Sequence, residues 1–130
     1  MPDHRIPPFA QTLGMTITQL DRDGARGEVL VDEPRSNSIG LLHGGAIMTF
    51  ADTLGALSTI ANLPPGMMTS TLESKTNFLA PIRVGDIARA TCVPLHRGST
   101  TMVWQTMITR GDGKLAAIVT QTQLVFPQVR

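Results

Sequence analysis

Asp52 is the residue of this 130-residue chain whose setting most strongly suggests chemistry. It is the only formally charged residue between Arg35 and Glu73. It also falls in the middle of a segment whose apolar spacing predicts a buried helix, where an ionised carboxylate without partners is costly. Such an acid must be neutralised, hydrogen-bonded, or turned toward a cleft or an interface. A structural role, capping a loop or pairing with an arginine, remains the alternative.

The predicted helix begins at His43-Gly44-Gly45. A helix N-terminus presents unpaired N–H groups and a partial positive charge, and glycines leave those groups uncovered. This arrangement suits a negative charge that develops on a carbonyl oxygen. The alternative is that the two glycines only allow a tight turn and that His43 only positions the loop.

Gly44 and Asp52 lie eight positions apart, which is roughly 12 Å along one helix at about 1.5 Å per residue. They therefore cannot both touch one reacting carbonyl from the same helix. Two antiparallel helices side by side would bring Gly44 of one subunit near Asp52 of the other. A joint function of these two residues requires a dimer.

The elements that position these residues follow from their periodicity. A helix is predicted from Gly44 to Ala61, because apolar and small residues recur at helical spacing on most of its circumference. Strands are predicted before it, at 15–20 and 25–31, and after it, at 67–79, 86–96, 100–109 and 115–126. Short glycine-bearing turns at 97–99 and 111–113 predict antiparallel hairpins between the last strands.

One helix cannot cover both faces of a sheet, which excludes a doubly wound α/β fold. The pattern predicts an α+β chain of the hotdog fold, a curved antiparallel sheet wrapped around one long central helix. We expect a single domain over residues 1–130, with residues 1–14 forming an arm.

Composition excludes several functions. The formal charge of +1, with one tryptophan and no tyrosine, argues against a nucleic-acid partner. The uncharged stretches carry glycines, prolines and hydroxyl residues, so no membrane partner is expected. A single cysteine, Cys92, and an N-terminus without a signal pattern predict a cytoplasmic protein. Motifs for nucleotide phosphates, a serine nucleophile or a metal are missing, so we expect no metal and no cofactor.

Two segments resemble the hotdog thioesterases of the phenylacetyl-CoA thioesterase type. The first is the run NSIGLLHGG at 37–45, followed by Asp52 at the expected offset. The second is TLESKTNFLAP at 71–81, with Val84-Gly85-Asp86 as the turn beyond it. The resemblance extends from about Ala25 to Phe126. It implies hydrolysis of acyl-CoA thioesters, aryl or phenylacetyl ones included, by a homodimer that pairs into a homotetramer.

The resemblance also implies residue roles. The backbone N–H of Gly44 would donate to the thioester oxygen, and Asp52 would act as nucleophile or as general base. Asn37 would orient the thioester or the attacking water, His43 would shape the loop, and Thr71 would position water. Because strand faces alternate, the sequence leaves open whether Thr71 or Ser70 faces the site.

Coenzyme A, here part of the substrate, is expected near strand ends and subunit interfaces. We assign Gly45, Asn77, Arg97 and Gly98 to its binding, with Arg97 as the candidate for its phosphates because arginine offers a fixed fork of donors. A solvent-exposed hairpin arginine is the alternative. For the whole chain, the alternative to an enzyme is a catalytically silent hotdog domain that binds an acyl-CoA or aromatic ligand.

Overall fold

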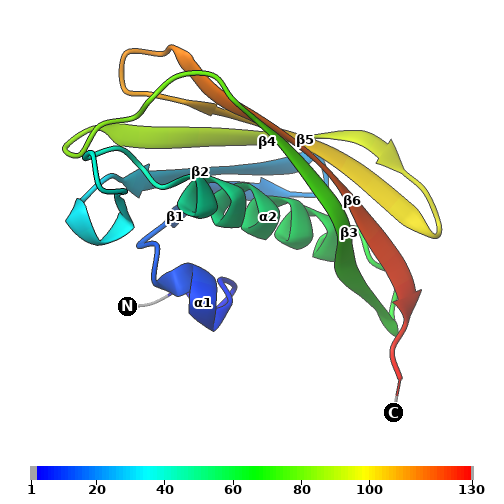
Figure 1. Ribbon diagram of the computed structural model, residues 1–130. Coiled ribbons are helices and arrows are strands. Elements are labelled where there is room, and N and C mark those ends of the chain that lie inside the picture. The colour runs from blue at the N-terminus through cyan, green and yellow to red at the C-terminus, as the bar shows by residue number, and fades with distance from the viewer. Residues whose placement is uncertain (1–2, 130) are drawn as a thin grey trace.

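The computed structural model describes residues 3–129 and contains one antiparallel sheet curved around one long helix (Figure 1). The six strands lie in the order β1-β2-β4-β5-β6-β3. Helix α2 (Gly44–Ile60) contacts every strand of the sheet along its concave face. This is the hotdog arrangement expected from the sequence. The strands are β1 (Thr16–Asp21), β2 (Gly24–Leu30), β3 (Met67–Phe78), β4 (Ile87–Arg97), β5 (Thr101–Thr109) and β6 (Leu115–Pro127).

Helix α2 is buried on most of its surface because its sequence is almost uniformly apolar or small. Phe50, Ala51 and Leu54 are at most 1% exposed. The polar groups of its second half are satisfied internally: the Trp104 indole donates to Thr59 Oγ1 over 2.8 Å, and the Thr59 hydroxyl donates to the helix backbone. No helix among residues 3–129 is long and apolar enough to cross a membrane.

The N-terminal arm contains a short helix that the sequence analysis did not predict, α1 (Pro8–Gln11). Its four residues are too few for an apolar period to be recognised. Ile6, Ala10 and Leu13 are buried and join the main core, so the arm packs against the body of the fold. In Figure 1 it lies on the side of α2 that faces away from the sheet. A 3-10 turn, η1 (Glu33–Arg35), leads from β2 toward the loop before α2.

The last strands form the predicted antiparallel hairpins, β4 with β5 and β5 with β6. Their bounds agree with the expected strands within two residues, as does the helix. A six-residue connection, 61–66, joins α2 to β3, which pairs with β6 at one edge of the sheet. The register of this pair shifts between Thr71 and Glu73. Because of this bulge, inward-facing positions change from odd to even numbers along β3.

Candidate active site

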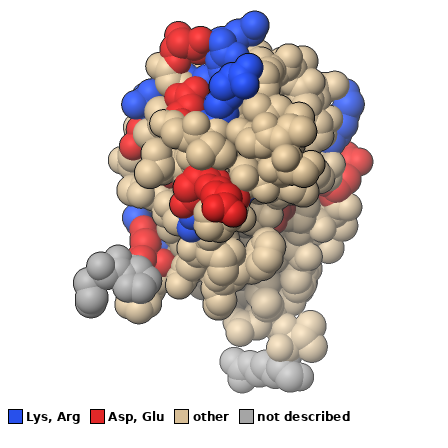
Figure 2. Space-filling model, turned by 60° about the vertical axis from the view of Figure 1, so that its left-hand side comes forward, with Lys and Arg blue, Asp and Glu red and all other residues tan. Residues whose placement is uncertain are grey.

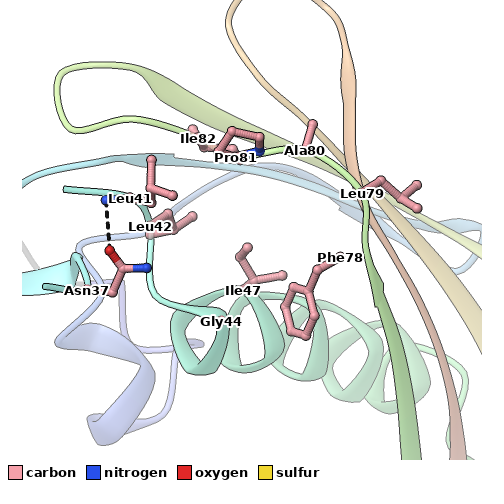
Figure 3. Close-up of a pocket in the computed structure, with 10 residues that line it drawn as sticks. All are labelled: Asn37, Leu41, Leu42, Gly44, Ile47, Phe78, Leu79, Ala80, Pro81 and Ile82. Atoms are coloured by element: carbon pink, nitrogen blue, oxygen red, sulfur yellow. Dashed lines mark hydrogen bonds between the residues drawn. The ribbon is translucent and has the colours of Figure 1, made fainter. Parts of the chain in front are cut away.

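The loop before α2 is held by Asn37. Its side-chain Oδ1 accepts hydrogen bonds from the backbone N–H groups of Ile39 and Leu41, both over 3.1 Å. These bonds fix the amide, and in Figure 3 its nitrogen is turned toward the side of the segment that runs from Leu42 to Gly44. Asn37 therefore offers a preorganised side-chain donor at the mouth of the helix.

The first turn of α2 leaves one donor free. His43 is the N-cap residue, and its Nδ1 accepts from the N–H of Gly45 over 2.8 Å. The N–H groups of Ala46 and Ile47 are bonded to the His43 carbonyl. Among the residues that the structure describes, the N–H of Gly44 has no acceptor. His43 thus shapes the helix start, and Gly44 presents the donor that an oxyanion would need.

Asn37 and Gly44 open into the same cavity, of about 380 Å³, whose wall is otherwise apolar (Figure 3). The ring of Phe78 lies against Gly44, so close that a Cβ at this position would be 3.2 Å from Cζ. A larger residue here would have to displace the Phe78 ring by a few tenths of an ångström, whereas glycine fits beside the ring and leaves the N–H uncovered. The rest of the lining comprises Leu41, Leu42, Ile47, Leu79, Ala80, Pro81 and Ile82.

Asp52 does not line this cavity. It lies two turns further along α2 and is only half-buried. Its Oδ1 is 2.6 Å from the hydroxyl of Thr71 on β3, whereas Ser70 is exposed on the other face of that strand. The structure thus brings Asp52 together with Thr71, and Asn37 together with Gly44, but leaves the two pairs apart within one chain.

Two glutamines of β6 complete the surroundings of Asp52, and the sequence analysis did not identify either. Gln123 Oε1 lies 2.6 Å from Thr71 Oγ1, and Gln121 Nε2 lies 3.4 Å from Asp52 Oδ1. Both side chains are completely buried. The sequence did contain a sign of them. Both have odd numbers, like Ala117, Val119 and Val125 on the inward face of β6, yet both are polar.

The residues assigned to coenzyme A are dispersed. Gly45 faces a second cavity, of about 420 Å³, between α1 and the start of α2. Asn77 is exposed on β3, and its neighbour Phe78 lines the cavity instead. Arg97 is the last residue of β4 and Gly98 begins the β4–β5 turn, which lies at the opposite end of α2 from Gly44 in Figure 1.

Arg97 makes contacts of its own at that end. Its Nη1 donates to the carbonyl of Arg22 over 2.7 Å and to Asp23 Oδ1 over 3.1 Å. Asn62, just past the end of α2, donates to the same carbonyl. These bonds connect the β1–β2 turn to the β4–β5 turn, which gives Arg97 a structural role. Its binding of phosphates stays a prediction.

Other basic side chains lie at the end where α2 begins. Figure 2, viewed from that side, shows Lys and Arg side chains together with acidic ones at the level of the β5–β6 turn. In this turn Arg110 donates two hydrogen bonds to Asp112, over 3.0 and 2.6 Å. The guanidinium holds the pKa of the Asp112 carboxyl well below its usual range. Arg83 is exposed and follows Ile82, which lines the cavity of Gly44.

Comparison with known proteins gives a consistent family. Residues 39–117 match the model of the thioesterase superfamily. The 1,4-dihydroxy-2-naphthoyl-CoA hydrolase of Listeria monocytogenes is 29% identical over 83% of this chain and 87% of that protein. A thioesterase structure from Haemophilus influenzae has a TM-score of 0.87 and 28% identity, covering 94% of this chain and 85% of the other. A hypothetical thioesterase of Streptococcus pneumoniae with coenzyme A has a TM-score of 0.80 and 26% identity, over 89% and 88% of the two chains.

Proposed function

Because this chain belongs to the thioesterase superfamily, we propose that it hydrolyses acyl-CoA thioesters to the free acid and coenzyme A. The observation that carries the proposal is the cavity that Asn37 and Gly44 both line, beside an otherwise apolar wall. Among residues 3–129, neither the Asn37 side-chain N–H nor the Gly44 backbone N–H has an acceptor. A thioester carbonyl needs such donors for the charge that its oxygen gains on attack. The named substrate of the Listeria relative and the coenzyme A in the Streptococcus structure are consistent with an acyl-CoA.

The reaction needs one further group, a carboxylate, and Asp52 is our candidate. As a general base it takes a proton from water while the water oxygen forms a bond to the thioester carbon. The resulting oxyanion is held by Gly44 and Asn37, and its collapse breaks the C–S bond. The proton then passes to the departing sulfur. As a nucleophile, Asp52 attacks the carbon itself, the C–S bond breaks, and coenzyme A leaves as a thiolate that takes a proton from water. A second water then hydrolyses the resulting anhydride to the free acid and restores the Asp52 carboxylate.

Either mechanism requires Asp52 to reach the carbonyl held at Gly44, so we propose a homodimer as the smallest active unit. Within one chain the two groups are eight residues apart on one helix, roughly 12 Å at about 1.5 Å per residue. Antiparallel α2 helices from two subunits would bring Gly44 of one subunit to Asp52 of the other. The same arrangement would bring the Arg97 end of one subunit toward the cavity of its partner. Pairing of dimers into a tetramer stays a prediction.

Strand β3 is the element best suited to such pairing. It is twelve residues long and lies at an edge of the described sheet, so one row of its backbone groups faces outward. Long unpaired edges are templates for strand addition unless charges or prolines block them. Met68, Leu72 and Phe78 of this strand are exposed apolar side chains. A second copy pairing along β3 would cover both features.

The acyl group that the cavity favours is apolar. Its wall is formed by leucine, isoleucine, alanine and proline side chains, with the Phe78 ring over Gly44. An aromatic ring packs well against another ring and against branched aliphatic side chains. We therefore propose aryl or arylacetyl thioesters as the preferred class. We also propose a cytoplasmic location, where acyl-CoA substrates would be available.

The test is release of free thiol from a panel of acyl-CoA compounds: acetyl-, hexanoyl-, benzoyl- and phenylacetyl-CoA. We expect turnover, with higher kcat/KM for the two aromatic substrates. Binding of these compounds without thiol release would overturn the enzyme proposal in favour of a silent binding domain. Equal turnover of all four would overturn only the aryl preference.

A further inference from the structure

The inward face of β6 carries two glutamines where a core strand ordinarily has apolar residues. Gln121 and Gln123 are completely buried, beside the equally buried Val119. Burying an amide is costly unless it is hydrogen-bonded. Gln123 stands directly opposite Thr71 in the β3–β6 pairing. Its polar end is therefore aimed at the hydroxyl that contacts Asp52.

A proton count gives the direction of these hydrogen bonds. Thr71 Oγ1 lies 2.6 Å from Asp52 Oδ1 and 2.6 Å from Gln123 Oε1. A hydroxyl carries one proton and can donate to only one of two acceptors. Among residues 3–129, Nε2 of Gln123 is buried and has no hydrogen-bond partner. The two ends of an amide are assigned from the bonding pattern. Turning the amide puts Nε2 against the Thr71 oxygen and frees the Thr71 proton for Asp52.

We propose that Gln123 is a positioning residue for Asp52: its amide donates to Thr71, which directs the single Thr71 hydroxyl proton onto Oδ1 of Asp52. This inference rests on the proposed function and adds a residue to it. The order is Gln123 Nε2–H to Thr71 Oγ1, then Thr71 O–H to Asp52 Oδ1. Gln123 touches no reacting atom and acts only through Thr71.

The consequence for Asp52 is that its two carboxylate oxygens have different surroundings. Thr71 and Gln121 both approach Oδ1, at 2.6 and 3.4 Å. Among residues 3–129, no group donates to Oδ2. One oxygen is thus anchored while the other remains for water or for the thioester carbon. A carboxylate held in one rotamer reacts faster than one that must be ordered in each turnover.

A double-mutant cycle between Thr71→Val and Gln123→Leu tests this order. Both changes keep approximate volume while removing hydrogen-bonding groups. We expect each single variant to lower kcat by about tenfold, the equivalent of one lost hydrogen bond, and to leave KM nearly unchanged. The double variant should be no slower than Thr71→Val alone, because Gln123 acts through the hydroxyl. Thr71→Ser keeps a hydroxyl, so it should keep activity and remain sensitive to Gln123→Leu.

The proposal would be overturned if the fold losses in kcat of the two single variants multiplied in the double variant. Wild-type kcat in a folded Gln123→Leu variant would also overturn it. Gln123→Met is the second variant, and loss of folding in both would reassign Gln123 to the core. The control is Thr122→Val, on the outer face of β6 beside Glu73, which should behave as wild type. Asp52→Asn distinguishes a failure of the Gln123 proposal from a failure of the proposed function of Asp52. If it is inactive while the Gln123 variants are normal, only this inference fails; if it is fully active, the proposed function of Asp52 fails.

Discussion

At the scale of single residues, the two ends of the Asn37 side chain have different tasks. Its oxygen accepts two backbone hydrogen bonds and holds the loop, while its nitrogen points toward the cavity. A carboxylate has the same shape and keeps both acceptor positions, but it cannot donate. Structure and catalysis at this residue can therefore be separated by one substitution.

We predict that Asn37→Asp retains the fold and lowers kcat/KM for acyl-CoA hydrolysis by about 10²-fold, because a donor to the developing oxyanion is replaced by a negative charge. Thermal unfolding and thiol release measure the two effects. Gln128→Glu, which changes an exposed amide just beyond β6 in the same way, is the matched control and should retain activity. If Asn37→Asp is as active as the control, Asn37 is only a loop residue.

Which residues surround Asp52 was partly predictable from the sequence. The isolation of Asp52 and its offset from His43 identified the acid and the helix start, and the helix agrees within one residue. The face of Thr71 was not predictable, because the bulge between Thr71 and Glu73 breaks the alternation along β3. Gln121 and Gln123 were missed because threonines alternate with them, so polarity alone does not distinguish the two faces of β6.

At the scale of elements, α2 and β6 approach each other through a glycine. A Cβ on Gly55 would lie 2.3 Å from Cδ of Gln121, which is closer than real Cβ contacts. Gly55 is thus the position where the helix accommodates the buried amide next to Asp52. Its helical propensity is poor, and the close packing of Gln121 outweighs that cost.

We predict that Gly55→Ala lowers both stability and kcat, although alanine is the better helix former. Overpacking a core of this kind costs about 1–3 kcal/mol, more than the ~1 kcal/mol gained in helix propensity. Displacement of Gln121 should also disturb Asp52. Urea unfolding and steady-state kinetics measure the two losses. In the double variant with Gln121→Ala the contact is gone, so stability should recover; continued destabilisation there would contradict this account.

At the scale of the whole molecule, the fold leaves its two groups of site residues at different positions along one helix. Asn37 and Gly44 lie at the start of α2, and Asp52 with Thr71 lies two turns away. One chain therefore contains two incomplete halves of a site. In the proposed dimer a second copy supplies the missing half, which would couple catalysis to assembly.

Hybrid dimers test this coupling. Asp52→Asn and Gly44→Val subunits, expressed together with different tags, form a dimer with one site intact and one doubly defective. We predict about half the wild-type turnover per hybrid dimer, although each parent homodimer is nearly inactive. Hybrids as inactive as the parents would show that the two groups act within one chain. Full turnover by a monomer, measured by sedimentation at assay concentration, would also contradict the dimer.

Thiol release by Asp52→Asn tests most directly whether Asp52 carries out the hydrolysis. Asparagine has nearly the same shape but can neither take a proton nor attack the thioester carbon. We predict a fall in kcat of at least ~10²-fold, with circular dichroism, thermal unfolding and oligomeric state unchanged. Glu73→Gln, an exposed acid on β3, should keep full activity as the matched control. Wild-type turnover by Asp52→Asn would contradict the account and assign the chemistry to another group.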